Sequence, residues 1–244
     1  MAKERLDVIV QERLGISRTE AQALIRAGKV FDSGGSRLDK PGSKVEADII
    51  LDIRGSKRYV SRGGEKLEAA LDALAWDLHG EDALDVGAST GGFTDCLLQR
   101  GAARVIAVDV GYGQLAWKLR RDPRVTLLER CNIRFLQPEQ LPFVPTFFTV
   151  DCSFISLRLV LPAVVRLVAP QARGIALIKP QFEAGPEHVS RGGVVRDPSV
   201  VAEVIQGLCA FAPTLGLHTI SVVPSPLLGP AGNREFLLAL QRKP

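Results

Sequence analysis

Strand-like and helical patterns alternate along most of this sequence, and that alternation restricts the possible folds more than any other feature. Short apolar runs typical of β-strands lie at 83–86, 104–108, 125–128, 147–150, 174–178, 219–223 and 236–240. Helical patterns lie near 65–75, 92–100, 113–121, 156–168 and 198–212. This order predicts a doubly wound α/β fold with a mostly parallel sheet. The last two strands are joined by a Pro/Gly loop with few helix signals, so we expect the last strand to run antiparallel.

A glycine-rich turn joins the first of these strands to a helix in ALDVGASTGGFTDCLL, residues 83–98. Glycines let the backbone approach a ligand closely, and a helix N-terminus offers free N–H groups to an anion. The next strand ends in Asp109, 24 residues after Asp85, where an acid can accept both hydroxyls of a cofactor ribose. A tight turn without a ligand is the alternative interpretation. The spacing Asp-x-Gly-x-x-x-Gly-Gly differs from the dinucleotide motif Gly-x-Gly-x-x-Gly, and therefore favours S-adenosylmethionine over NAD.

Charged residues stand at the ends of three predicted strands. Asp151 and Lys179 each follow a strand, in FFTVDCSF and GIALIKPQF, and Glu235 precedes the last strand in GNREFLLAL. Each has an ordinary explanation: a helix cap, an exposed lysine and a surface glutamate. Open α/β sheets place their sites at the carboxyl ends of strands. We therefore expect the three to meet in one crevice, with Lys66 reaching it from the preceding helix.

Two lysines and two carboxylates in one crevice suit the alkylation of a hydroxyl group. The hydroxyl must lose its proton as it attacks, and a lysine that is desolvated or close to another cation can act as the base. The carboxylates would orient the ammonium groups. A sulfonium cofactor supplies its own electrophilic carbon, so this chemistry requires no metal.

The first 53 residues predict a separate, small α+β module. Ser17 and Glu20 form a capping-box pattern at the start of a helix, and Gly28 follows at the position that usually ends one. The polar residues of this helical segment share one face, at spacings of three and four: Arg18, Gln22, Arg26 and Lys29.

The excess positive charge of the chain lies in this first quarter. Residues 1–62 contain 13 Lys/Arg against 9 Asp/Glu, whereas the rest contains 18 of each. A basic module beside a neutral one indicates a segment that binds a polyanion, although an ordinary solvated surface would look similar.

The four cysteines and three histidines show no spacing typical of metal ligands, so we expect no metal site and no disulfide framework. Together with the absence of a signal-peptide pattern in MAKERLDVIV, this favours a cytoplasmic protein. The apolar region near 143–169 is interrupted by charges and prolines, so we expect no membrane insertion.

Five separated motifs resemble the TlyA (hemolysin A-like) family, relatives of the FtsJ-type ribose methyltransferases: YVSRGGEKL, DVGASTGGFTDCLL, VDCSFISL, IKPQFE and GNREF. SRTEAQALIRAGKV and LDKPGSKV resemble the RNA-binding domain first seen in ribosomal protein S-four. The resemblance covers residues 5–240. It implies an S-four-type domain at 1–53, a linker at 54–63 and a Rossmann-like methyltransferase domain at 64–244.

The resemblance further implies S-adenosylmethionine-dependent 2′-O-methylation of cytidine in ribosomal RNA or ribosomal subunits. It implies a catalytic Lys66-Asp151-Lys179-Glu235 tetrad with Lys179 as the base. The implied cofactor contacts are Asp85, Gly87, Ser89, Thr90, Gly91, Gly92, Phe93, Asp109, Val110, Asn132 and Asp151. The candidate RNA contacts are Arg5, Arg18, Gln22, Arg26 and Lys29.

Three alternatives stay open at this point: a membrane-active hemolysin, a non-catalytic RNA-binding protein on a methyltransferase fold, and an NAD-dependent enzyme. The sequence contains no signal for a pore, and a pure RNA binder would not need Lys179 or Asp151. It leaves open the modified nucleotide, the ribosomal subunit and the oligomeric state.

Overall fold

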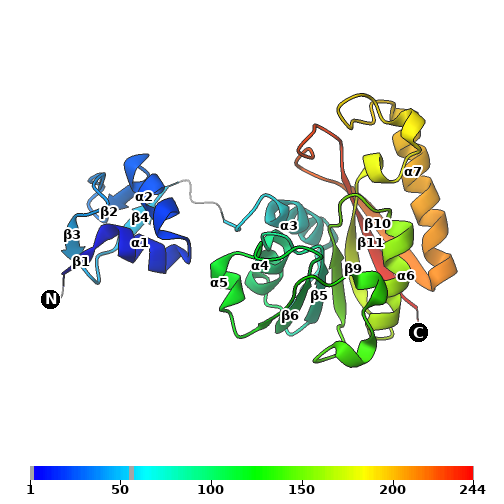
Figure 1. The fold of residues 1–244 in the computed structure, drawn as a ribbon, viewed down its shortest axis with the longest axis horizontal. Coiled ribbons are helices and arrows are strands. Elements are labelled where there is room, and N and C mark those ends of the chain that lie inside the picture. Colours follow the sequence, from blue (N-terminus) through cyan, green and yellow to red (C-terminus); the bar gives the residue numbers. More distant parts are fainter. Residues whose placement is uncertain (1–2, 55–57, 244) are drawn as a thin grey trace. The chain divides into compact units, whose positions relative to one another are not determined.

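The computed structural model describes residues 3–54 and 58–243, and within them the chain forms two compact units (Figure 1). The smaller unit comprises the described residues up to Arg58 together with 116–121. The larger unit comprises 59–115 and the described residues from 122 onward.

The smaller unit combines two helices with two antiparallel strand pairs. α1 spans Leu6–Leu14 and α2 spans Arg18–Arg26. The strands are β1 (Lys3–Arg5) paired with β3 (Lys44–Glu46), and β2 (Val30–Asp32) paired with β4 (Leu51–Ile53). Its core is formed by Leu6, Val10, Ala21, Ile25 and Val30. The predicted small α+β module is therefore present.

Both predicted ends of α2 are present. The Glu20 backbone N–H donates to Ser17 Oγ at 3.3 Å, and the Ser17 N–H donates to Glu20 Oε2 at 2.9 Å, which completes a capping box. Gly28 adopts the left-handed conformation, with φ +66°, just past the last turn. Lys29 therefore lies beyond the helix rather than on its last turn.

The larger unit contains a seven-stranded sheet with the order β10-β11-β9-β8-β5-β6-β7. The strands are β5 (Asp82–Val86), β6 (Arg104–Val108), β7 (Val125–Leu128), β8 (Phe147–Val150), β9 (Arg173–Ile178), β10 (Leu217–Pro224) and β11 (Phe236–Arg242). β11 is antiparallel to both of its neighbours, whereas the five strands from β9 to β7 are parallel. The predicted mostly parallel sheet with an antiparallel last strand is confirmed.

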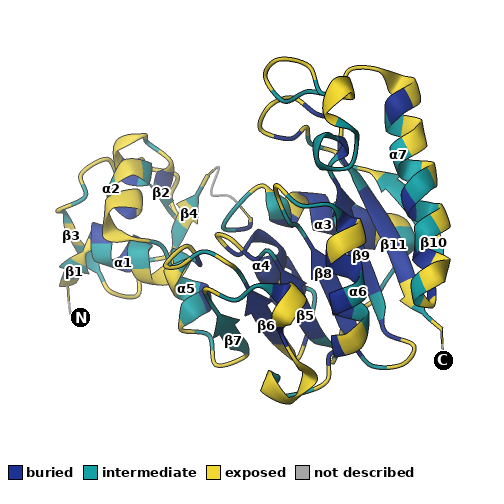
Figure 2. Ribbon diagram, turned by 45° about the vertical axis from the view of Figure 1, so that its right-hand side comes forward, coloured by how far each residue is buried: buried dark blue, intermediate teal, exposed yellow. Residues whose placement is uncertain are grey.

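Helices cover both faces of this sheet (Figures 1 and 2). α3 (Gly63–Leu74) packs beside α4 (Gly92–Gln99), and α6 (Leu157–Leu167) and α7 (Pro198–Phe211) lie on the opposite face. Leu84 of β5, Ile106 of β6 and Phe148 of β8 belong to the main core together with residues of α6. Successive side chains of a strand point to opposite faces, so the neighbours of these residues point away from α6. The 3₁₀ helices are Ile133–Phe135, Pro138–Gln140, Pro180–Phe182, Pro186–His188 and Ala212–Leu215.

The helix predicted near 113–121 is shorter than expected. α5 comprises only Trp117–Arg120. Gly113 has φ +71°, and Ala116 is extended with ψ 139°, so the helical hydrogen-bond ladder cannot begin earlier.

One described helical stretch, Pro198–Leu215, is apolar and long enough to cross a membrane, and 17% of it is buried. Composition alone therefore does not exclude a span there, contrary to the sequence-based expectation. In the folded chain, however, Val204, Ile205 and Cys209 of this stretch pack against the main core. The stretch thus packs against the core of the larger unit through one side.

The stretch 54–63 was predicted as a linker, but part of it belongs to the larger unit. Residues 55–57 lie outside the described part of the chain. Tyr59 is only 2% exposed, and Gly63 begins α3, so the segment from Tyr59 onward belongs to the larger unit.

Candidate active site

The turn between β5 and α4 brings the backbone close to the end of β8. Gly87 has φ +83°, and a Cβ there would lie 2.6 Å from the Asp151 carbonyl oxygen. Gly91, with φ +94°, precedes the first turn of α4. Only glycine fits such a close approach without displacing the neighbouring strand. The predicted glycine-rich turn therefore packs directly against the strand end that carries Asp151, and this contact leaves no room for a side chain at Gly87.

Asp109 stands at the end of β6 and faces the same turn. Its carboxylate accepts hydrogen bonds from the backbone N–H groups of Ser89 and Gly111, each at 2.7 Å. These bonds fix the carboxylate in place and leave further lone pairs on both oxygens. It can therefore accept bonds from the hydroxyls of a ribose.

A cavity of about 400 Å³ opens between the turn and the ends of β6, β7 and β8. This volume falls in the range of small-molecule sites. Of the predicted cofactor residues, it is lined by Gly87, Ser89, Asp109, Val110, Asn132 and Asp151. A carboxylate for a ribose, a glycine cradle and an apolar rim from Ile133 and Val160 fit a nucleoside cofactor.

Asp85, predicted as a cofactor contact, lies beneath the turn and lines neither cavity. It is fully buried, and its carboxylate accepts from Thr94 Oγ1 at 2.6 Å and from Thr149 Oγ1 at 2.9 Å. Burial raises its pKa to about 6, against the opposing effect of the two hydroxyl donors. Asp85 therefore stabilises the turn through its hydrogen bonds with Thr94 and Thr149.

Lys179 and Asp151 form an ion pair across the ends of β9 and β8. Lys179 Nζ lies 2.6 Å from Asp151 Oδ1 and donates a hydrogen bond to Ser153 Oγ at 2.9 Å. The Lys179 side chain is only 11% exposed, and Ser156, rather than Asp151, caps α6. Pro180 has no backbone N–H, so the strand ends where the amine is presented.

Lys66 and Glu235 form a second, more deeply buried pair. Lys66 Nζ lies 2.5 Å from Glu235 Oε2, with side chains 9% and 0% exposed. Because β11 is antiparallel and Phe236 pairs with Ile178, its first residues lie at the same edge as the carboxyl end of β9. Glu235 Oε1 has no hydrogen-bond partner among the described residues. A buried carboxylate oxygen left in this state is available to a ligand donor.

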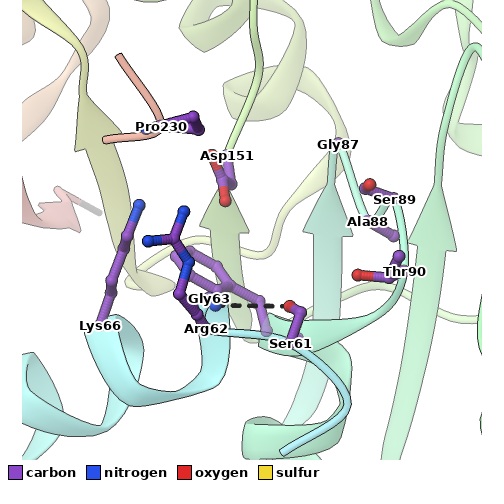
Figure 3. A pocket seen from close by; sticks show the side chains of 12 residues that line it. Ser61, Arg62, Gly63, Lys66, Gly87, Ala88, Ser89, Thr90, Asp151 and Pro230 are labelled. Atoms are coloured by element: carbon purple, nitrogen blue, oxygen red, sulfur yellow. Dashed lines mark hydrogen bonds between the residues drawn. The ribbon is translucent and has the colours of Figure 1, made fainter. Parts of the chain in front are cut away.

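One residue of each ion pair, Lys66 and Asp151, lines a hollow beside the turn (Figure 3). A second cavity, of about 190 Å³, is lined by Lys66, Asp151 and turn residues including Thr90, Gly92 and Phe93. Gly87, Ser89 and Asp151 line both cavities. Lys179 and Glu235, the other two residues of the predicted tetrad, contact Asp151 and Lys66 respectively. Gly91 lines neither cavity and serves the turn through its backbone conformation.

Several residues at this site were not predicted from the sequence. Figure 3 shows Arg62 beside Lys66, with its guanidinium directed toward the same hollow. Arg62 precedes Lys66 by one helical turn, and that spacing is the signal that could have indicated it. Phe154 lines the larger cavity with an 89% exposed side chain, at φ +64° and with its ring centroid 5.1 Å from that of Phe182.

The candidate RNA-binding residues lie in the smaller unit. Arg5, Arg18 and Gln22 all donate to the carboxylate of Asp7. Arg26 and Lys29 are exposed. The sequence reasoning did not identify Asp7 as the centre of this group.

The sheet order, the glycine-rich turn and the acids at the strand ends define a methyltransferase fold. The N-methyltransferase NodS of Bradyrhizobium japonicum superposes with a TM-score of 0.50 at 13% identity, covering 75% of this chain and 95% of that one. At this low identity, the likeness shows the fold alone.

The chain belongs to the FtsJ-like methyltransferase family, whose sequence profile matches residues 59–242. The 16S/23S rRNA (cytidine-2′-O)-methyltransferase TlyA of Mycobacterium tuberculosis is 46% identical, covering 98% of this chain and 90% of the relative. Hemolysin A of Brachyspira hyodysenteriae is 38% identical, covering 96% and 98%. A solved hemolysin-named structure from Streptococcus thermophilus is 43% identical with a TM-score of 0.75, covering 100% of this chain and 90% of that one.

The protein is therefore a methyltransferase, and its cofactor is S-adenosylmethionine, as the spacing of the turn predicts. Within the described ranges, no group of three or more His, Cys, Asp or Glu side chains is arranged to hold a metal ion.

Proposed function

We propose that this protein methylates the 2′-hydroxyl of a cytidine ribose in ribosomal RNA. The observation that carries the proposal is the presence of two lysine–carboxylate pairs, one buried and one partly buried, near the glycine-rich turn of an FtsJ-like methyltransferase. Relatives from Mycobacterium tuberculosis and Campylobacter jejuni, 46% and 32% identical, bear the name rRNA (cytidine-2′-O)-methyltransferase. Action on ribosomal RNA agrees with these names, and we place this action, on ribosomal RNA or ribosomal subunits, in the cytoplasm.

Lys179 is the residue we assign as the base. In its neutral form, Nζ accepts the proton of the 2′-hydroxyl as the oxygen forms its bond to the methyl carbon and the carbon–sulfur bond breaks. When bound, S-adenosylmethionine would supply the electrophilic methyl group, with the neutral thioether as the leaving group. Asp151 and Ser153 hold the amine in position at the strand end, which reduces the entropic cost of reaching the reactive geometry.

Lys66 and Glu235 support the reacting oxygen from the other side of the hollow. The Lys66 ammonium stabilises negative charge that develops on the 2′-oxygen, and Glu235 fixes its direction. The larger cavity, which Asp109 and Asn132 line, would hold the nucleoside part of the cofactor, and the Gly87–Phe93 turn would contact its amino-acid part.

The smaller unit, an S-four-type domain in this proposal, holds structured RNA through Arg5, Arg18, Gln22, Arg26 and Lys29. These residues would contact chiefly phosphates, which position the substrate without reading its sequence. The hemolysin name of one relative does not alter the proposal, because the apolar stretch that could span a membrane packs on the core through Val204 and Ile205.

Replacing the proposed base tests this function. Lys179→Ala should lower methyl transfer to ribosomal RNA by at least about 100-fold, the usual contribution of a general base, with S-adenosylmethionine affinity nearly unchanged. Radiolabelled methyl transfer and calorimetric cofactor binding measure the two quantities. Lys243→Ala, an exposed lysine at the C-terminal end, is the control. Wild-type transfer by Lys179→Ala would remove Lys179 from the mechanism, and absence of transfer by the wild type would support a non-catalytic RNA binder.

A further inference from the structure

The smaller unit contains a fully buried carboxylate that the methyl-transfer site does not use. Asp7, in the first turn of α1, is 0% exposed. Its oxygens accept hydrogen bonds from Arg5 Nε at 3.0 Å, Arg5 Nη2 at 3.0 Å, Arg18 Nε at 3.1 Å and Gln22 Nε2 at 2.8 Å. Side chains from the end of β1 and from two turns of α2 are thereby joined at one point.

The two arginines that converge on Asp7 remain half exposed. Their side chains are 45% and 50% accessible, for Arg5 and Arg18 respectively. Arg18 donates to Asp7 through Nε, which leaves the two Nη groups at the outer end of its half-exposed side chain. Each guanidinium is thus hydrogen-bonded to the buried carboxylate on one side and exposes further N–H donors to solvent on the other.

Stability alone is a weak reason for this arrangement. Burying a carboxylate is costly, and a buried ion pair contributes little net stability compared with apolar residues of similar volume. A first-turn acid could interact with the helix dipole from an exposed position. The paired guanidiniums hold the pKa of Asp7 well below its usual range, so the group stays charged.

The arrangement has the features of a preorganised anion-binding site. Two guanidiniums and one carboxylate leave a net charge of +1, and Lys44 adds another cation because it pairs with Arg5 across the β1–β3 ladder. Arginine forks match phosphate oxygens in geometry, and a fork fixed in advance loses less entropy on binding than a free one.

We propose that Asp7 is a positioning residue that fixes Arg5 and Arg18 at the spacing required by two backbone phosphates of structured RNA. This inference rests on the proposed RNA-binding function of the smaller unit. It assigns to Asp7 the discrimination between a folded RNA, whose phosphates have fixed separations, and a flexible strand of equal charge.

The test compares full-length wild type with Asp7→Asn, which keeps the size of the side chain but removes its charge. Affinity for a folded ribosomal RNA hairpin should fall by roughly 10-fold, from the entropy of two released side chains. Affinity for an unstructured strand of the same length should stay equal or rise, because the net charge increases. S-adenosylmethionine affinity should not change.

Equal losses for both RNAs, or no loss for the hairpin, would overturn the proposal. If Asp7→Asn unfolds the smaller unit, as judged by circular dichroism, Arg5→Lys combined with Arg18→Lys replaces it. That variant keeps both charges but loses the forks, so it should lose hairpin affinity to a similar degree, whereas wild-type affinity would contradict the proposal. If wild-type protein binds neither RNA, the proposed function fails, and this result is distinct from failure of the role of Asp7.

Discussion

At the scale of single residues, Asp85 links pH to stability. Its pKa is raised from 3.8 to about 6, chiefly by burial. The pKa of Asp85 is higher in the folded state than in the unfolded state. The contribution of protonated Asp85 to the free energy of unfolding is therefore complete below pH 3.8 and is lost as the pH rises through about 6. The shift corresponds to about 1.4 kcal/mol of unfolding free energy for each pKa unit.

Asp85→Asn should therefore change how the stability of the larger unit depends on pH. The asparagine side chain can still bond Thr94 and Thr149 but cannot ionise. Between pH 4 and 7, the unfolding free energy of the wild type should fall relative to the variant by about 2 to 3 kcal/mol. Urea unfolding at both pH values measures this. A constant difference between the two proteins across that range would show that Asp85 keeps an ordinary pKa.

At the same scale, the sequence motifs indicated residue types and strand ends but not contacts. Lys179 and Asp151 were placed at neighbouring strand ends by pattern alone, and the structure brings them to 2.6 Å. Asp85 was predicted to contact the cofactor because it begins the turn motif, and periodicity could not show that its side chain faces Thr94 of α4. Asp7 was missed because its partners come from two separate elements.

At the scale of elements, the β5–α4 turn depends on Gly87. Alanine there would combine a left-handed backbone conformation with a Cβ only 2.6 Å from the Asp151 carbonyl oxygen. Gly87→Ala should therefore push β8 away from the turn and lower S-adenosylmethionine affinity by at least about 10-fold, the equivalent of about 1.4 kcal/mol.

Gly80→Ala separates backbone strain from steric contact as the cause of the predicted loss of cofactor affinity. Gly80 also has a positive φ, of 79°, but a Cβ there would meet nothing within 4 Å. The strain is comparable, and the steric contact is missing, so this variant should lose some stability and keep its cofactor affinity. Isothermal calorimetry decides the comparison. Equal cofactor affinities for the two variants would show that the close approach at Gly87 does not shape the site.

Element positions were largely predictable because apolar strands and amphipathic helices leave strong periodic signals. α5 was the exception: the predicted 113–121 contracts to Trp117–Arg120, since Gly113 and the extended Ala116 interrupt it. The convergence of Glu235 with the parallel strand ends could be inferred only after β11 was taken as antiparallel.

At the scale of the whole molecule, the chain combines a methyltransferase unit with a basic α+β unit. The fold of the larger unit follows from the alternation of its elements, and its family is shown by the match over residues 59–242. The role of the smaller unit rests on its basic residues, because charge excess alone does not identify a partner. The preformed arginine pair around Asp7 gives that role a geometric basis.

The most direct test of the central claim is mass-spectrometric mapping of ribose methylation in ribosomal RNA from cells with and without this protein. We predict 2′-O-methylcytidine at one or more defined positions, present with the wild-type protein and absent without it or with Lys179→Ala. Ribosomal RNA with identical ribose methylation in all three cases, or methylation of a base instead of a ribose, would contradict the account.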